Sequence, residues 1–369
     1  MSHFRLTCPK CGMERPADMS PEACTGCGSP LDVKYSSNVR KLSEMPTPLH
    51  DFKSRLTLGE GNTPLTELAT IGGKLPLRKL YAKLEFLNPT GSFKDRGTAT
   101  MLSVALEHGV SELVEDSSGN AGASVSAYAA RAGIKSHIFV PADAPEAKLR
   151  QIIAYGPNVH PIKGSRDTVT TAAVNYCKKH GIVYTSHMLS PYFAEGTKAF
   201  AYEVAEQFGQ ELPDHIAFPV GNGSLLIGAY NGFRELKESG RIDNIPKLHC
   251  VQSRNVMPLV SAFNGVNWSS DQAVKTIAGG ISIAAPSRQW QILNILRLTG
   301  GSAVAAEEAN ILKMQQALAE LEGIFAEPTS AAAFAGLEIL AKTNAIHQSD
   351  SVLVPVTGFG LKDEPPPST

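Results

Sequence analysis

From about residue 56 onward, short runs of β-branched and apolar residues alternate with stretches of helical pattern. We expect strands at Leu113–Glu115, Lys135–Val140, Ile182–Thr185, His215–Val220, Leu248–Gln252 and Val352–Val356. Helices are expected at Ala121–Ala132, Glu146–Tyr155, Arg166–Lys179, Ala194–Phe208, Leu225–Lys237, Val256–Phe263, Arg288–Leu298, Ala306–Glu322 and Ser330–Lys342. This alternation is typical of α/β proteins in which helices cover both faces of parallel sheets. Because 369 residues exceed the ~250 of a single hydrophobic core, two sheets are expected.

Charge and hydropathy exclude several classes of partner. The chain has 34 Lys and Arg against 35 Asp and Glu, a formal charge of −1, so it has no electrostatic reason to bind nucleic acid or an anionic membrane. No run approaches the ~18 apolar residues that a membrane span requires. The segment MSHFRLTCPK has no apolar region of the kind that a secretory signal carries, so a cytoplasmic location is expected.

Four of the six cysteines form two Cys-x-x-Cys pairs near the N-terminus, Cys8 with Cys11 and Cys24 with Cys27. Four thiolates in this spacing can bind one Zn²⁺ in a closed tetrahedral site, which holds a small ribbon together and leaves no open position for catalysis. The alternatives are four reduced thiols or two disulfides, and a cytosolic setting disfavours disulfides. The remaining cysteines, Cys177 and Cys250, are expected to be buried small hydrophobic residues.

A glycine-rich loop, Val220-Gly221-Asn222-Gly223-Ser224, lies between an expected strand and an expected helix. Glycines let the backbone approach an anion, and a helix N-terminus adds free N–H groups, so a phosphate is the natural ligand. The loop lacks the Lys of a P-loop and the third Gly of a dinucleotide fingerprint. The alternative is a tight turn that binds nothing.

A second loop, Asn88-Pro89-Thr90-Gly91-Ser92-Phe93-Lys94-Asp95-Arg96-Gly97, places a lysine in the first turn of a helix, with Ser92 or Thr90 as the expected cap. The helix dipole and Arg96 would lower the pKa of Lys94, and Asp95 would oppose this. A lysine with a lowered pKa can supply the amine of a Schiff base. The alternative is a solvated lysine on a helix face.

A third loop, Asp116-Ser117-Ser118-Gly119-Asn120-Ala121-Gly122-Ala123-Ser124, again joins a strand to a helix. Its small residues can form a nest of N–H groups that holds a carboxylate, and an Asn amide can bind a hydroxyl. Taken alone, it is a capping loop.

Together, the loops resemble the motifs of the threonine synthase family, within the fold-type II pyridoxal-phosphate (PLP) enzymes that also include tryptophan synthase β. Four features carry this resemblance in order over nearly the whole chain: the four-cysteine ribbon, GEGNTPL at 59–65, NPTGSFKDRG at 88–97 and TGFGLKD at 357–363. It implies two parallel-sheet α/β domains of PLP fold type II, a large one formed by 37–90 and 205–369 and a smaller one formed by 91–204. A zinc-ribbon-like segment at 1–36 precedes them.

The resemblance also implies roles for individual residues. Lys94 would form the Schiff base with PLP and move protons, and Asn120 would bind the cofactor's 3′-oxygen. Thr357 would face the pyridine nitrogen, where a hydroxyl favours elimination and replacement over transamination. The cofactor phosphate would be held by Gly221, Asn222, Gly223, Ser224 and Leu225. The substrate carboxylate would be received by Ser117, Ser118 and Gly119.

The chain departs from the family pattern at the site for a substrate phosphate. Threonine synthases convert O-phosphohomoserine and water to threonine and phosphate, and they use a Thr directly after the cofactor Asn and an Arg in a segment like N-S-x-N-P-x-R. Here these positions are Ala121 and Phe193, the latter in a segment that begins Thr185-Ser186 and is expected to line the substrate site. Either another cation substitutes, with Lys198, Arg288 and His187 as candidates, or the substrate is not phosphohomoserine.

The expected function is therefore a PLP-dependent carbon–oxygen lyase of the threonine synthase type, acting on a small amino acid as a homodimer. The alternative on the same scaffold is β-elimination, as in serine or threonine dehydratases, or β-replacement on an O-activated serine. An uncharged wall at Ala121 and Phe193 would favour that alternative. A nucleic-acid-binding role for the ribbon is disfavoured, because only Arg5, Lys10 and Arg15 are basic within Phe4–Ala23.

Overall fold

The computed structural model describes residues 4–19, 23–35, 55–75, 77–144, 146–209 and 211–363. The chain forms two compact units, the first made of Met1–Glu60 and Asn88–Ala199 and the second of Gly61–Leu87 and Phe200–Thr369. The three-part division expected from the sequence stays a prediction, and its boundary between residues 36 and 37 lies outside the described residues. No described helix has both the length and the apolar character that crossing a bilayer requires.

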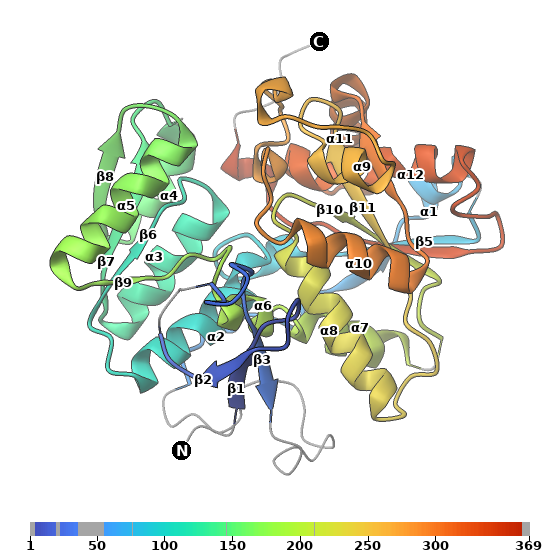
Figure 1. Ribbon diagram of the computed structural model, residues 1–369. Coiled ribbons are helices and arrows are strands. Elements are labelled where there is room, and N and C mark those ends of the chain that lie inside the picture. Colours follow the sequence, from blue (N-terminus) through green and yellow to red (C-terminus); the bar gives the residue numbers. More distant parts are fainter. Residues whose placement is uncertain are drawn as a thin grey trace. The chain divides into compact units, whose positions relative to one another are not determined.

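The first unit contains a four-stranded parallel sheet in the order β8-β7-β6-β9 (Figure 1). Its strands are β6 (Glu112–Glu115), β7 (Lys135–Pro141), β8 (Asn158–Ile162) and β9 (Val183–Tyr184). Its helices are α2 (Lys94–Glu107), α3 (Asn120–Ala132), α4 (Glu146–Ala154), α5 (Arg166–His180) and α6 (Pro191–Gly196). Successive strand residues point to opposite faces: Leu113 packs in the core with α2 and α3, whereas Val114 packs with α5.

The N-terminal ribbon is a three-stranded antiparallel sheet in the order β2-β1-β3, and it belongs to the first unit. Its strands are β1 (Phe4–Thr7), β2 (Glu14–Pro16) and β3 (Asp32–Tyr35). The ribbon's Phe4 and Leu6 are buried in the same hydrophobic core as Met101 and Leu102 of α2. The ribbon is therefore packed as part of this unit.

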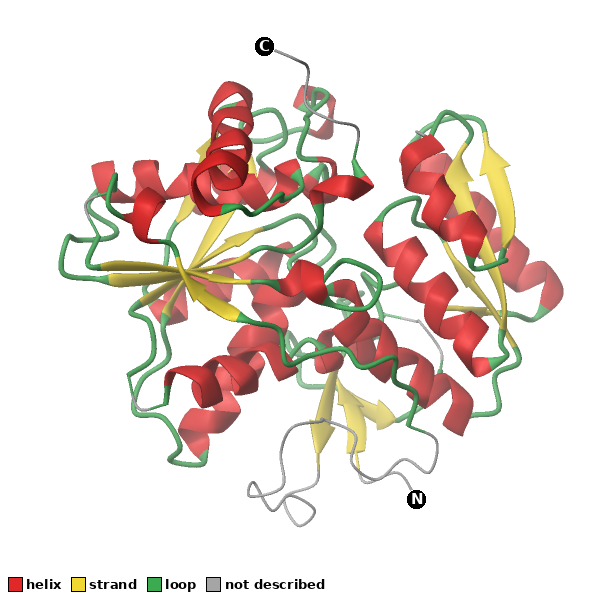
Figure 2. Ribbon diagram, turned by 180° about the vertical axis from the view of Figure 1, so that it is seen from behind, coloured by secondary structure: helices red, strands yellow, loops and turns green. Residues whose placement is uncertain are grey.

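The second unit is built on a six-stranded sheet in the order β12-β11-β10-β13-β5-β4, parallel except for the edge pair β4–β5. Its strands are β4 (Leu65–Glu67), β5 (Lys79–Lys83), β10 (His215–Pro219), β11 (Lys247–Ser253), β12 (Ala303–Ala306) and β13 (Ser351–Pro355). Its α-helices are α1 (Ala69–Gly72), α7 (Ala199–Phe208), α8 (Ser224–Glu238), α9 (Pro258–Phe263), α10 (Gln289–Thr299), α11 (Glu308–Glu322) and α12 (Pro328–Lys342). Helices flank the strands on both sides, as Figure 2 shows in red and yellow. This confirms the expected fold class.

One expected helix is interrupted. The sequence predicts a single helix over Ala194–Phe208, whereas the chain forms α6 and α7 with a break at Thr197 and Lys198. The helix α6 begins earlier, at Pro191, because the Ser190 side chain accepts a hydrogen bond from the Phe193 N–H and caps it. At its other end, Gly196 packs so closely on the Arg96 carbonyl oxygen of α2 that a Cβ would overlap that atom. The break is therefore caused by tertiary packing, which the local sequence pattern does not show.

A directed chain of hydrogen bonds crosses the second unit's sheet near the N-terminal ends of its parallel strands. The Ser302 N–H donates to Nδ1 of His249 at 3.1 Å, and Nε2 of His249 lies 2.8 Å from Nδ1 of His215. Nε2 of His215 lies 3.0 Å from the Asp350 carboxylate. Because Nδ1 of His249 must accept, its Nε2 carries the proton, and both imidazoles are satisfied in the neutral form. Burial lowers the pKa of His249 to about 3.

We expect the protein to lose stability on acidification below about pH 6.5, the ordinary pKa of an unfolded histidine. Between that pH and about 3, where His249 is protonated only when unfolded, the free energy of unfolding falls with decreasing pH. The slope from this one group is about 1.4 kcal/mol per pH unit. The His249→Gln variant should have a shallower slope when urea midpoints are compared from neutral to mildly acidic pH.

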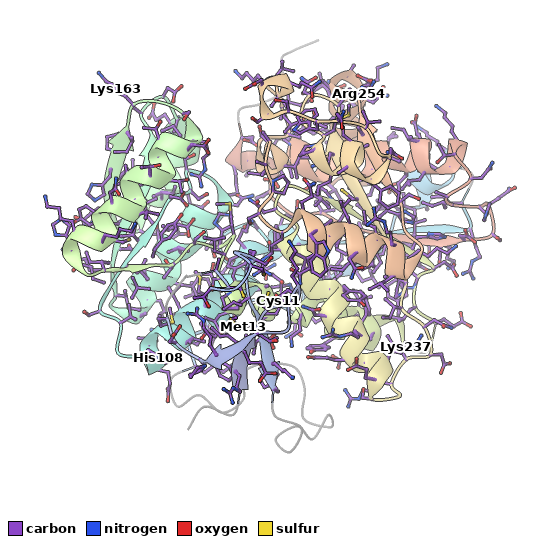
Figure 3. The ribbon with its side chains drawn as sticks, viewed as in Figure 1. Cys11, Met13, His108, Lys163, Lys237 and Arg254 are labelled. Carbon is purple, nitrogen blue, oxygen red and sulfur yellow. The ribbon has the colours of Figure 1, made fainter. Side chains whose placement is uncertain are left out.

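The control for this measurement is His108→Gln, because the His108 side chain is exposed (Figure 3). Its urea midpoints should follow those of the native protein at every pH. Equal slopes for native protein and His249→Gln would contradict the assignment of the acid sensitivity to this buried pair.

Candidate active site

The loop before α2 is fixed by a buried carboxylate. Asp95 accepts hydrogen bonds from the Thr90 N–H at 2.7 Å and from the Thr90 hydroxyl at 2.6 Å. The Ser124 hydroxyl of α3 donates to the same carboxylate at 2.6 Å. The expected cap by Ser92 or Thr90 is therefore wrong: Phe93 is the N-cap residue without a side-chain cap bond, and Thr90 binds Asp95 instead. These contacts hold the first turn of α2 against the loop and against α3.

Lys94 is the first residue of α2, as the sequence predicts, and its side chain lies over two aromatic rings. Nζ is 4.6 Å from the centre of the Phe93 ring and 5.6 Å from that of Phe193. Lys94 is half-buried, whereas its neighbours Asp95 and Arg96 are buried. An amine held at a helix N-terminus, partly shielded yet accessible, suits covalent chemistry with a carbonyl group.

The loop at 116–121 turns sharply from the end of β6 into α3. Ser117, Ser118, Gly119 and Asn120 are half-buried, and α3 begins at Asn120 with no side-chain cap bond. Gly122 is packed so tightly that a Cβ would overlap the Ser117 carbonyl oxygen. The loop therefore lies folded over the first turn of α3, where its small residues and the positive end of the helix dipole suit an anion.

The two positions that depart from the family pattern are apolar and buried. Phe193 is fully buried against Gly97 of α2, where a Cβ would lie 2.7 Å from its ring, and Ala121 is 2% exposed. Thr185 is also buried and donates its hydroxyl hydrogen to the Val114 carbonyl oxygen at 3.0 Å, and Ser186 is fully buried. These residues offer a phosphate dianion no charge-assisted partner.

The three candidate substitute cations are all engaged with other groups. Lys198 is 2% exposed, forms an ion pair with Glu195 and lies 5.2 Å from the centre of the Tyr35 ring in the ribbon. Arg288, in the second unit, donates to Gln291 at 2.9 Å. His187 is bonded to a buried carboxylate of β6, and sequence reasoning did not identify that carboxylate.

The glycine-rich loop of the second unit connects β10 to α8. Gly223 is the N-cap residue of α8 with φ +76°, and a Cβ there would lie 2.5 Å from Ile292. A Cβ at Gly221 would lie 3.0 Å from Ile283. Since α8 is a 15-residue helix whose N-cap Gly223 makes no side-chain cap bond, the positive end of its dipole faces the glycine-rich loop and favours an anion there. The residues present fit a phosphate group.

Thr357 follows β13 in the second unit and is 2% exposed. Its hydroxyl lies 3.0 Å from the Ser330 hydroxyl and 3.2 Å from the Glu327 carboxylate, both at the start of α12. The Gly358 N–H also donates to Ser330, at 3.1 Å. Thr357 is thus held in a fixed polar network.

The four cysteines of the ribbon lie together, with all four Sγ atoms within 4.8 Å of one another. The pairs Cys8–Cys27 and Cys11–Cys24 are 3.5 Å apart, too long for a disulfide and near the ~3.8 Å that tetrahedral coordination by ~2.3 Å bonds requires. Both knuckles have the same backbone: Gly12 and Gly28 adopt positive φ and donate to the carbonyls of Cys8 and Cys24. Figure 3 labels Cys11 together with Met13, which begins the return into β2. The donor set fits one zinc ion.

Comparison with known proteins shows the family to which this chain belongs. Residues 56–358 match the family model described as "Pyridoxal-phosphate dependent enzyme". The chain is 34% identical to the threonine synthase of Methanosarcina acetivorans over 98% of this chain and 92% of that protein. It is 33% identical to the threonine synthase of Methanocaldococcus jannaschii, over 96% and 92% of the two chains. The chain belongs to the pyridoxal-phosphate-dependent enzymes, in the family that contains the threonine synthases.

Solved structures of PLP enzymes share its fold at lower identity. Maize serine racemase superposes with a TM-score of 0.74 at 20% identity, covering 86% of this chain and 94% of the other. The processed form of threonine deaminase isoform 2 from Solanum lycopersicum superposes with a TM-score of 0.69 at 22% identity, covering 80% and 79%. At this identity the likeness establishes PLP fold type II alone. The family establishes that this protein is a PLP-dependent lyase.

We expect Gly122→Ala to destabilise this PLP enzyme, because the added methyl group would overlap the Ser117 carbonyl oxygen and force the 116–121 loop to move. A loss of about 1–3 kcal/mol is expected for overpacking, measured as a shift in the urea midpoint of unfolding. Gly119→Ala is the matched control in the same loop, because its Cβ would have 3.9 Å of space to the nearest atom and φ is −108°. A midpoint unchanged in both variants would contradict the tight packing at Gly122.

Proposed function

We propose that this PLP enzyme forms threonine from O-phosphohomoserine and water, with release of phosphate. The observation that carries the proposal is the agreement over nearly the whole chain with proteins named threonine synthase, at 34% and 33% identity. It is supported by the half-buried lysine at the start of α2 and by the uncapped glycine-rich N-terminus of α8.

The roles proposed for the first unit centre on Lys94. Its Nζ would bond the cofactor covalently and would later move the proton at the substrate α-carbon. The partial exposure of Lys94 beside two aromatic rings supports this role. Asn120 donates a hydrogen bond to the 3′-oxygen of the cofactor. Ser117, Ser118 and Gly119 bind the substrate carboxylate through the uncapped turn before α3.

The roles proposed for the second unit concern the pyridine nitrogen and the phosphate group of PLP. Bound PLP supplies an electron-withdrawing ring that weakens bonds at the substrate α-carbon. Thr357 would face the pyridine nitrogen, and because a hydroxyl does not force that nitrogen to be protonated, it would favour elimination and replacement over transamination. The phosphate group is bound by backbone N–H groups of Gly221, Asn222, Gly223, Ser224 and Leu225.

A second candidate function is β-elimination or β-replacement on serine, threonine or an O-activated serine. The observation that favours it is the apolar wall formed by Phe193 and Ala121, which are both buried. The pairing of Lys198 with Glu195 adds to it, because that lysine is then not available to a substrate phosphate. An uncharged leaving group fits such a wall better than a dianion does.

The substrate is tested by supplying O-phosphohomoserine, L-serine and L-threonine separately and measuring threonine, phosphate and ammonia. The proposal expects threonine and phosphate from the first substrate, and no turnover by Lys94→Ala. Phe193→Arg combined with Ala121→Thr should lower KM for phosphohomoserine about tenfold or more, corresponding to ~1.5–3 kcal/mol for a hydrogen bond to a charged group. If native protein and double variant both ignore phosphohomoserine while the native protein releases ammonia from serine or threonine, the second candidate replaces the first.

We also propose that Cys8, Cys11, Cys24 and Cys27 bind one structural Zn²⁺. Two knuckles of equal geometry and a sulfur cluster of tetrahedral dimensions support this. The zinc would take no part in the reaction, because four protein ligands leave no position for a substrate.

Metal analysis of reduced protein should find about one zinc per chain. Cys11→Ser should lose the metal and lower the melting temperature, because zinc binding contributes directly to folding. Cys177→Ala, which changes a buried cysteine outside the ribbon, should keep its zinc. A native protein that contains no zinc, or a Cys11→Ser protein that retains it, would contradict the site.

A further inference from the structure

A buried carboxylate–imidazole pair lies within the first unit at the end of β6. Oε1 of Glu115 is 2.8 Å from Nδ1 of His187, and the backbone N–H of His187 donates to Oε2 at 3.3 Å. Glu115 is fully buried, and the His187 side chain is 10% exposed. Two contacts therefore fix the orientation of the imidazole, which directs Nε2 away from Glu115. No described residue makes a hydrogen bond with this Nε2.

The ring of Phe193 lies close to both His187 and Lys94. The rings of His187 and Phe193 pack edge to face with centres 5.7 Å apart, and Nζ of Lys94 lies 5.6 Å from the centre of the same Phe193 ring. Glu115 also directly precedes the loop 116–121 proposed to bind the substrate carboxylate. The imidazole and the lysine amine thus both lie beside the Phe193 ring, and the loop begins next to the carboxylate that holds the imidazole.

The charges around the pair come from several elements. Lys94 of α2 and Arg166 of α5 are positive, and both favour the ionised form of Glu115 and disfavour protonated His187. Asp116, which follows β6 and forms an ion pair with Arg166 at 3.0 Å, has the opposite effect on His187. Tyr184 of β9 also faces the pair, and because burial raises the pKa of its phenol, it is neutral and adds no charge.

Burial opposes a charge on either member of the pair. It raises the pKa of Glu115 to about 7 and lowers the pKa of His187 well below its usual value. When Glu115 is ionised, Nδ1 of His187 carries the hydrogen and Nε2 is a bare acceptor. When Glu115 is protonated, it donates to Nδ1, so Nε2 carries the hydrogen. One proton on Glu115 therefore converts Nε2 from acceptor to donor.

We propose that His187, oriented by Glu115, is a second acid–base residue of the reaction and accepts at Nε2 the proton of a neutral protic nucleophile, of which water is the one that threonine formation needs. This inference rests on the proposed function. Glu115 is the positioning residue that receives the Nδ1 proton in the same step.

The step balances as an addition of water across the Cα=Cβ bond that the amino acid carries once its Cγ–O bond has broken and phosphate has left with that electron pair. The O–H bond breaks, and its electron pair stays on oxygen and forms the new bond to Cβ. The π pair of Cα=Cβ forms a C–H bond with a proton returned by Lys94. The water proton goes to Nε2, the Nδ1 proton goes to Glu115, and the pair later releases one proton to solvent. After the transfer, Glu115 is protonated and His187 is neutral, so the buried pair carries no net charge. Burial therefore does not oppose this transfer.

The pair is tested first without turnover, on the PLP-loaded protein labelled with ¹⁵N-histidine. The ring-nitrogen shifts of His187, assigned by their loss in His187→Gln, should change from one neutral tautomer to the other around pH 7. In Glu115→Gln this change should disappear. A His187 that keeps one tautomer across this range in the native protein would overturn the shared proton.

The catalytic role is tested by kinetics with whichever substrate the native enzyme converts. The rate should rise with pH and level off above about 7, because Nε2 is an acceptor only when Glu115 is ionised. His187→Gln should lower kcat by about 100-fold or more with a small effect on KM. Glu115→Gln should remove the rise with pH, which a merely structural role would not do.

The control is His137→Gln, which breaks a similar contact at the opposite end of the same strand. Nε2 of His137 lies 2.6 Å from Glu112, the first residue of β6, whereas Glu115 is the last. This variant should keep the native kcat and pH profile. A His187→Gln protein with native kcat, or with a kcat lowered no more than in His137→Gln, would overturn the catalytic role. This holds even if the tautomer change of His187 is observed. If the native enzyme converts none of the substrates, the proposed function fails, and the tautomer measurement alone decides the pair.

Discussion

The arrangement of the first unit depends on the buried carboxylate of Asp95. It accepts two hydrogen bonds from Thr90 and one from Ser124, and so joins the loop before α2, the first turn of α2 and the helix α3. The Ser124 and Thr98 hydroxyl oxygens also lie 2.8 Å apart, which adds a second link between the two helices. Because hydrogen bonds to a buried charge are strong and costly to lose, this group fixes where Lys94 lies relative to the 116–121 loop.

Much of this could be read from the sequence because the signals are local. Strand–helix alternation predicts parallel sheets, paired Cys-x-x-Cys spacing predicts two knuckles, and a glycine-rich strand–helix turn predicts an anion site. The left-handed backbone at Gly223 and the crowding around Gly221 give physical reasons for those glycines. Such features need no knowledge of distant residues.

The misjudged parts depend on contacts between distant segments. Thr90 has the chemistry of a cap, but Asp95 competes for its hydrogen bonds. Lys198 looks like an available cation, but Glu195 and Tyr35 occupy it, and Tyr35 is 163 residues away in the ribbon. Glu115 ends an expected strand with no local sign of a partner, and only the fold reveals that it is fully buried against His187. Sequence spacing carries no information about these pairings.

The shared core of the ribbon and α2 has a consequence for how this enzyme could be dissected or degraded. Phe4 packs edge to face on Tyr192 with ring centres 6.0 Å apart, and it is buried in one core with Leu6, Leu31 and Met101. Cleavage that released the ribbon would bare a contiguous apolar surface on the unit that carries Lys94, and surfaces of that kind drive aggregation. The ribbon therefore shields this apolar surface from solvent. We expect chaperones and proteases to remove a truncated enzyme faster than it could act.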